Sequence, residues 1–189
     1  GVVGPDYSRY WKNEQLPDNA RINSIGVAEV PSGFYHFWGY VSPLRNASSL
    51  KEIENYPLED MSTWDMSDMT EIVKNAHAKG RVVRGWVGHI YENAWQIRGY
   101  EEFLMDMIDR PAWAQCLLDR LADQCLIRAK AYAKAGVDWI QCGDDVANQN
   151  ALMFAPDHWR KLMKERWAKV YAAARAIKPD IEIWYHSDG

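Results

Sequence analysis

The stretch AGVDWIQCGDD, residues 135–145, decides the fold class of this chain. Gly136 fits the residue that ends a helix, and the apolar run over residues 137–142 predicts a short buried strand. A glycine ends this strand, and Asp144 and Asp145 follow it directly. A helix end, a short buried strand and a polar strand end, in this order, are typical of a βα repeat.

The same alternation continues on both sides of this stretch. Upstream, the pattern predicts a strand, a loop and two helices, in this order: residues 81–87, 88–94, about 95–108 and about 111–135. Downstream, it predicts a helix that opens at Pro156 and a last strand over residues 181–186. The order strand–helix–strand–helix–strand predicts a parallel sheet with right-handed crossovers.

Two parallel architectures fit this order, a doubly wound sheet and a (β/α)8 TIM barrel. No GxGxxG or GxxxxGK[ST] motif follows a predicted strand, so the usual marker of a nucleotide-binding sheet is missing. Long loops after the strands, at 88–94 and 143–155, favour the barrel. The chain ends on a strand with no helix to cover it, so we expect an incomplete α/β barrel, about half of the whole.

The first part of the chain departs from this regularity. Residues 1–20 are polar and predicted to be irregular, whereas residues 21–60 predict a β-hairpin and a loop insertion, with turn chemistry at Pro31-Ser32-Gly33. Residues 61–189 hold the βα units, including a helix over 67–79. We expect all 189 residues to form part of one barrel domain.

Composition excludes several classes of function. The net charge is −4 and no basic run stands out, so we expect no nucleic-acid partner. No apolar run approaches the length of a membrane span. The three cysteines are odd in number and lack CxxC spacing, which favours a reducing, cytoplasmic setting over a disulfide framework.

Candidate functional residues follow the predicted strands, because ligands of parallel α/β folds bind beyond the carboxyl ends of the strands. After the strand at 81–87, we expect four side chains to contact substrate: Trp86, His89, Tyr91 and Trp95.

The adjacent carboxylates Asp144 and Asp145 are candidate catalytic residues. Side chains alternate along an extended strand, so one of the two is expected to face the ligand, and the other to cap a loop or bind an arginine. A structural role for both, holding loop amides, is the alternative. A buried acidic pair would raise the pKa of one member and so allow acid–base chemistry.

The pair His186-x-Asp188 ends the last predicted strand. Two residues apart on an extended strand lie on the same side, so the pair can supply two metal ligands, or a base and the group that orients it. We expect His186 to be catalytic or metal-binding, and Asp188 to contact substrate.

Five segments in order resemble the uroporphyrinogen decarboxylase superfamily, which also includes cobalamin-linked methyltransferases. The segments are GYEEFL at 99–104, AGVDWI at 135–140, GDD at 143–145, APDHW at 155–159 and HSDG at 186–189. The resemblance spans roughly residues 25–189. It implies a (β/α)8 barrel about twice as long as this chain, with the active site at the barrel mouth and a large anionic or methylated substrate.

The departures from the family pattern separate its two branches. The decarboxylases place an Arg-rich loop and an essential aspartate near their N-terminus, which have no counterpart here, and Trp95 stands where they carry a substrate-pocket tyrosine. The methyltransferases bind zinc through His-x-Cys and a later cysteine. Here His186 matches, but Asp188 replaces the thiolate. Asp188-Gly189 resembles the strand end of the decarboxylases.

The resemblance therefore implies first a lyase of porphyrin biosynthesis that removes carboxylates from a tetrapyrrole without a cofactor. The alternative is methyl transfer involving zinc at His186, a corrinoid and a corrinoid protein. A third reading is a catalytically inactive fragment. A homodimer is compatible with each of the three.

Overall fold

The computed structural model describes residues 4–33, 38–61 and 64–188. The chain divides into two compact units. The first comprises Gly1–Asp60 and Asn93–Leu117, and the second comprises Met61–Glu92 and Leu118–Gly189. The candidate site lies in the second unit.

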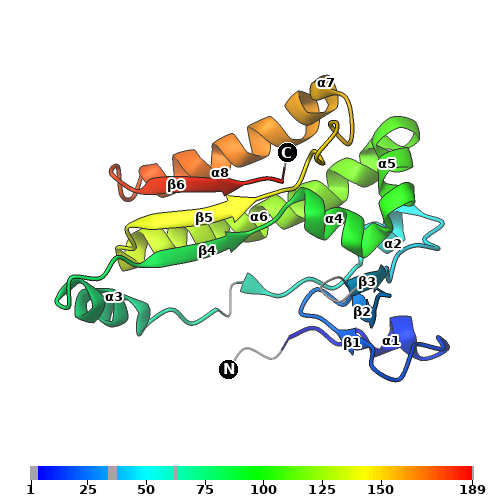
Figure 1. The fold of residues 1–189 in the computed structure, drawn as a ribbon, viewed down its shortest axis with the longest axis horizontal. Helices are drawn as coiled ribbons and strands as arrows, with labels where there is room; N and C mark the ends of the chain where they lie inside the picture. The colour runs from blue at the N-terminus through cyan, green and yellow to red at the C-terminus, as the bar shows by residue number, and fades with distance from the viewer. Residues whose placement is uncertain (1–3, 34–37, 62–63, 189) are drawn as a thin grey trace. The chain divides into compact units, whose positions relative to one another are not determined.

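A three-stranded parallel sheet forms the centre of the second unit (Figure 1). Its strands are β4 (Arg84–Gly88), β5 (Trp139–Gly143) and β6 (Glu182–His186), in the order β4-β5-β6. The strands are consecutive in the chain, and all pairs are parallel. The predicted α/β class with a parallel sheet is confirmed.

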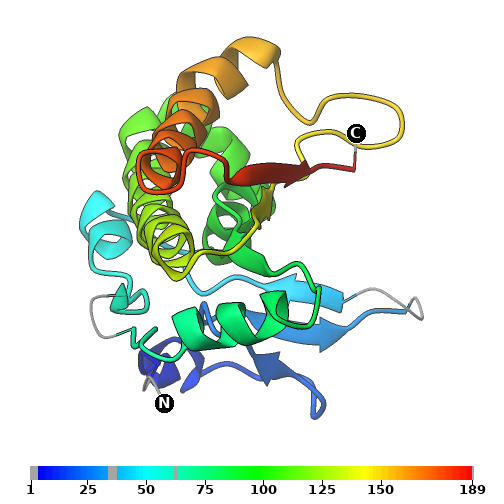
Figure 2. The same cartoon turned by 90° about the vertical axis from the view of Figure 1, so that its left-hand side faces the viewer.

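Helices α6 (Pro111–Ala135) and α8 (Glu165–Arg175) run along the sheet on the same side of it (Figure 2). Gly85 of β4 faces this side, because a Cβ atom there would lie 2.4 Å from the ring of Tyr132 in α6. Cys142 of β5 also faces it, with Sγ 3.5 Å from the hydroxyl of Tyr171 in α8.

The opposite face of the sheet carries Trp86, Gln141 and Trp184, which are paired in register across the three strands. Trp86 and Trp184 remain 41% and 46% exposed. Alternation along each strand therefore separates a face packed on helices from an open face that is rich in tryptophan.

The remaining helices of the second unit are α3 (Met69–His77), α7 (Pro156–Trp159) and the π-helical turn η2 (Arg160–Lys164), which leads into α8. The helix predicted over 67–79 is confirmed, and Gly80 follows it with φ +66°. The helix predicted from Pro156 also forms, with the π turn inside it.

The first unit contains an antiparallel sheet of β1 (Arg21–Ile22), β2 (Ala28–Pro31) and β3 (Trp38–Val41). Pairing of β2 with β3 confirms the predicted hairpin, although residues 34–37 lie outside the described residues. This unit also contains α1 (Ser8–Trp11), a short helix where the sequence predicted irregular chain, and α2 (Leu50–Glu54).

Two local predictions between β4 and α6 are wrong. The loop expected over 88–94 is shorter, because α4 (Tyr91–Arg98) already begins at Tyr91. The single helix expected over 95–108 is divided at Gly99, and α5 (Tyr100–Asp109) follows it. Gly99 has φ +105°, a conformation that breaks a helix and that residues with a Cβ atom rarely adopt.

Within the described ranges, none of the helices combines the length and apolarity needed to cross a membrane. In the part of the chain that the structure describes, Cys116, Cys125 and Cys142 form no disulfide with one another.

Candidate functional site

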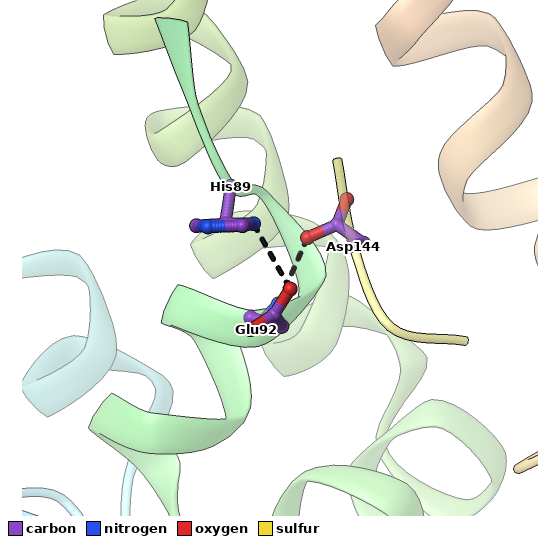
Figure 3. A group of neighbouring side chains, drawn as sticks. All are labelled: His89, Glu92 and Asp144. Carbon is purple, nitrogen blue, oxygen red and sulfur yellow. Dashed lines mark hydrogen bonds and ion pairs between the residues drawn. The ribbon is translucent and has the colours of Figure 1, made fainter. Parts of the chain in front are cut away.

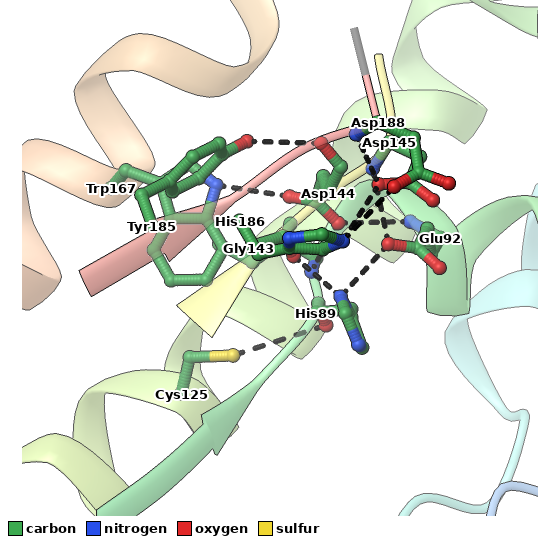
Figure 4. A network of polar contacts seen from close by, with 11 residues as sticks. His89, Glu92, Cys125, Gly143, Asp144, Asp145, Trp167, Tyr185, His186 and Asp188 are labelled. Atoms are coloured by element: carbon green, nitrogen blue, oxygen red, sulfur yellow. Dashed lines mark hydrogen bonds and ion pairs between the residues drawn. The ribbon is translucent and has the colours of Figure 1, made fainter. Parts of the chain in front are cut away.

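Acidic and imidazole side chains meet at the carboxyl ends of the three parallel strands (Figure 4). His89 and Glu92 follow β4, Asp144 and Asp145 follow β5, and His186 ends β6. The paired parallel register brings these ends together, since Gly143 pairs with His186 in the β5–β6 ladder. The convergence predicted from the sequence is therefore present for these groups.

Asp144 is fully buried, with no exposed surface. Its Oδ1 accepts hydrogen bonds from the backbone N–H groups of Ile90 and Glu92, each at 3.0 Å. Its Oδ2 accepts the indole N–H of Trp167 at 3.0 Å. Burial raises the pKa of Asp144 to about 7, although the N–H donors and the nearby His89 favour the charged form.

These contacts explain why α4 begins earlier than predicted. The first N–H groups of a helix have no partner inside the helix, and a side-chain oxygen usually satisfies them from the residue just before it. Here the acceptor is Asp144, which lies 54 residues after Ile90 and 52 after Glu92. A cap supplied from so far along the chain leaves no local signal in the sequence.

Glu92 binds His89 through its side chain (Figure 3). Its Oε1 lies 2.9 Å from Nδ1 of His89 and also accepts the backbone N–H of Asp145 at 3.0 Å. Burial raises the pKa of Glu92, but the bond to His89 and the charge of that ring outweigh it and leave the pKa lowered. For His89, burial lowers the pKa, but the bond to Glu92, the charges of Glu92 and Asp144 and the carbonyl group of Gly143 together leave the pKa raised.

The second group is more exposed and consists of Asp145, His186 and Asp188. Nε2 of His186 lies 3.2 Å from Oδ1 of Asp188 and 4.0 Å from Oδ1 of Asp145. The same oxygen of Asp145 accepts the backbone N–H of Asp188 at 2.9 Å. Burial raises the pKa of Asp145, against the opposing effect of this N–H donor. The sequence allowed one aspartate to face the ligand while the other holds loop amides. Asp144 holds the amides of Ile90 and Glu92, and Asp145 lies in the more exposed group with His186 and Asp188.

The other predicted contact residues take different places. Trp86 lies on the open face of the sheet with its ring edge-on to His89, at 5.0 Å between centroids. Tyr91 has no exposed surface and packs against Phe154 at 5.1 Å, which gives it a packing role. Trp95 belongs to the first unit, where its ring contacts those of Tyr40 and Tyr100.

Two residues that organise the site were given no catalytic, substrate-binding or metal-binding role from the sequence. Glu92 orients His89, and Trp167 satisfies the second oxygen of Asp144. The spacing of three residues between His89 and Glu92 was a usable signal, since such a pair meets where a helix begins. No sequence signal connects Trp167 to Asp144, because the contact depends on how α8 packs on the sheet.

Two groups in the described part of the chain have the ligand types of a metal site: His89, Glu92 and Asp144, and Asp145, His186 and Asp188. In each group one donor atom from every residue lies within 4.8 Å of the others. The first group is a poor ligand set, because both oxygens of Asp144 are already bound and fully buried. The second combines two carboxylates and an imidazole, all at least partly exposed.

Comparison with known proteins supports the fold. A solved structure of a methyltransferase from Methanosarcina mazei matches with a TM-score of 0.50 and 22% sequence identity, over 64% of this chain. The chain spans 35% of the length of that protein, and at this identity the likeness concerns the fold alone. Among curated proteins, no match is found.

The family model described as uroporphyrinogen decarboxylase (URO-D) matches residues 40–189, which include every strand-end residue of the site. This range covers most of the chain and agrees with the resemblance seen in its ordered segments. The chain belongs to the uroporphyrinogen decarboxylase (URO-D) family.

Proposed function

We propose that the strand ends of β4, β5 and β6 form part of an enzyme active site that catalyses methyl transfer with a bound divalent metal ion. Asp145, His186 and Asp188 would hold the ion. The observation that carries the proposal is the approach of one imidazole nitrogen to two carboxylates, at 3.2 and 4.0 Å. The superfamily to which this family belongs includes methyltransferases as well as decarboxylases, and the solved structure with a similar fold is a methyltransferase.

The donor set fits a metal that accepts oxygen and nitrogen ligands. Two carboxylates and one imidazole suit zinc, manganese or iron, whereas a thiolate at the position of Asp188 would have selected a softer ion. The His186 and Asp188 side chains are 50% and 60% exposed, so a further ligand has access. A metal bound here would act as a Lewis acid on a sulfur or oxygen atom of the substrate.

The charge of the site also favours a cation over a polyanion. Glu92, Asp144, Asp145 and Asp188 contribute four carboxyl groups around His89 and His186. A substrate with several carboxylates would be repelled by this group, whereas a metal ion would be attracted. We propose a corrinoid protein as the partner that supplies or receives the methyl group.

Decarboxylation of a tetrapyrrole carboxylate is the second candidate. It is favoured by the family description and by Asp145, a partly exposed carboxyl group whose pKa is raised by burial. This chemistry needs a carboxylate beside a protonated pyrrole and arginines that hold the acetate groups.

We also propose that the three parallel strands belong to a (β/α)8 barrel, in which the open, tryptophan-rich face lines the interior.

Metal analysis of the purified protein separates the two reactions. We expect about one divalent ion per chain, and at least a tenfold loss of metal in His186→Ala and in Asp188→Ala. His77→Ala is the matched control, because His77 pairs with Asp138 at 2.9 Å away from these strand ends and should leave the metal content unchanged.

Activity assays complete the test. Methyl transfer would be followed by the absorbance of methylcobalamin, and decarboxylation by chromatography of products from uroporphyrinogen III. In the catalysed reaction, His186→Ala should lower turnover at least about tenfold, which corresponds to roughly 1.4 kcal/mol in the barrier. Decarboxylation by protein that has been stripped of metal would reject methyl transfer as the function.

A further inference from the structure

His89 has two nitrogen atoms in different surroundings. Nδ1 lies 2.9 Å from Oε1 of Glu92 and 2.5 Å from the carbonyl oxygen of Gly143. Both neighbours accept hydrogen bonds and neither donates one, so Nδ1 must carry a proton. In the neutral ring the lone pair is therefore on Nε2.

The Nε2 edge of the ring points away from the carboxylates of Glu92 and Asp144 (Figure 3). The His89 side chain is 24% exposed, and its ring lies against that of Trp86, which is 41% exposed on the open face of the sheet. A basic nitrogen is thus presented on the side of the sheet that α6 and α8 leave uncovered.

A chain of supporting contacts fixes this orientation. Asp144 binds the backbone N–H of Glu92, and Glu92 binds both the His89 ring and the backbone N–H of Asp145. Asp144 is itself held by Trp167. Because these oxygens are engaged, His89, Glu92 and Asp144 form a support for one imidazole and are not a second metal site.

We propose that His89 is the residue that exchanges a proton with the substrate through Nε2, and that Glu92 is its positioning residue. An imidazole with one nitrogen bound to a carboxylate and the other accessible is the usual arrangement for general acid–base catalysis. This proposal rests on the proposed function in one respect, because both place the active site at the ends of β4, β5 and β6.

Both candidate reactions include one step in which a proton moves between the substrate and a group of the enzyme. In methyl transfer to a thiol or a hydroxyl group, the S–H or O–H bond breaks and the proton passes to Nε2. The electron pair left on sulfur or oxygen forms the bond to the methyl carbon, while the bond between that carbon and the methyl donor breaks and its electron pair leaves with the donor. In decarboxylation, the C–C bond to the carboxylate breaks and CO₂ leaves. The electron pair stays on the remaining carbon, which takes a proton from Nε2 of the protonated His89 ring. Exchange with water returns His89 to its starting state.

The first test needs no substrate. In ¹⁵N NMR spectra of the protein at a pH where the rings are neutral, His89 should show the tautomer with hydrogen on Nδ1. His77 is an internal control, because its Nε2 faces Asp138 Oδ2 at 2.9 Å and should carry the hydrogen there. Hydrogen on Nε2 of His89 would overturn the proposal, since that nitrogen would then have no free pair.

The second test uses whichever of the two reactions the protein catalyses. His89→Ala should lower kcat about 100-fold, within the usual range for loss of a general acid or base, and added imidazole should restore at least tenfold. Glu92→Gln should lower kcat with little change in KM and shift the pH profile to lower pH. His77→Ala should leave kcat unchanged.

The metal content of His89→Ala separates this proposal from the previous one. We expect it to equal that of the wild type, because His89 is not among the proposed ligands. A folded His89→Ala protein with wild-type kcat would overturn the role of His89 even where the metal is present. Wild-type protein without metal would overturn the metal site, and the tautomer and the imidazole rescue would still decide on His89.

Discussion

The carboxylate of Asp144 accepts the backbone N–H of Glu92 at 3.0 Å, across 52 residues of chain. This bond joins the end of strand β5 to the first turn of helix α4. It also places the Glu92 side chain where it meets His89. The sequence predicted that Asp144 is catalytic. In the structure Asp144 is buried and instead holds Glu92, which in turn binds the partly exposed His89.

Asp144→Asn should destabilise the protein by about 1–3 kcal/mol, measured by urea denaturation. Asparagine still offers one oxygen to the N–H groups of Ile90 and Glu92, but its NH₂ group then faces the indole N–H of Trp167, so two donors oppose each other. We also expect at least about a tenfold loss of turnover, as His89 loses its support.

The control for this variant is Asp145→Asn. The Asp145 side chain is 31% exposed and its oxygen accepts one N–H, which asparagine also accepts, so stability should change by less than about 0.5 kcal/mol. Equal stability of the two variants would contradict the role of Asp144 as a cap.

The His89–Glu92 pair should stabilise the fold within a limited pH range. The pKa of His89 is raised above 6.5, so its contribution is complete below that pH and disappears as the pH rises through the folded-state pKa. The pKa of Glu92 is lowered from 4.5, so its contribution is complete above that pH and disappears as the pH falls through the lower, folded-state pKa. The pair therefore contributes most between about pH 4.5 and 6.5.

The measurement is the free energy of unfolding of the wild type and of Glu92→Gln across the pH range. Their difference should be largest between about pH 4.5 and 6.5 and should shrink at alkaline pH. Glu101→Gln, on the exposed start of α5, is a suitable control and should give a difference that does not follow this window. A difference that grows above pH 7 would show that the sign is wrong.

Arg98→Ala should destabilise the first unit by about 3–5 kcal/mol. Arg98 is 2% exposed, its Nε binds Asp106 at 2.7 Å, and its removal leaves the buried Asp106 without its buried counter-charge. Arg110 binds the same carboxylate at 2.9 Å, but its side chain is 43% exposed. Arg110→Ala should therefore cost only about 1 kcal/mol, and equal losses for both would argue against burial as the cause.

Gly85→Ala should destabilise the second unit by about 1–3 kcal/mol through overpacking. The added Cβ atom would lie 2.4 Å from the ring of Tyr132, so the strand and the helix cannot keep their present distance. Gly33→Ala is the control, because no atom lies within 4 Å of its added Cβ. Combining Gly85→Ala with Tyr132→Ala should cost less than the sum of the two changes, and full additivity would contradict the contact.

Local patterns in the sequence were sufficient for the element order of the second unit. The apolar runs at β4, β5 and β6 and the helical spacing before each following strand predicted a parallel sheet, which the strand pairing confirms. The glycines after α3 and α6 were identified for the same reason, because helix ends and short strands depend on neighbouring residues. The same rules placed the acidic and imidazole groups at one edge.

Which aspartate is buried, where α4 begins and which partner holds His89 depended on the tertiary structure. The first two are set by contacts between segments more than 50 residues apart, the bonds of Asp144 to Ile90 and Glu92. The third is set by Glu92, which lies three residues from His89 and is itself held by Asp144. Such contacts form only after the parallel strands have paired and the helices have packed on them. Periodicity and spacing in the sequence therefore identified which residues gather at the site. Long-range hydrogen bonds in a buried environment decided which of them is buried and which is exposed.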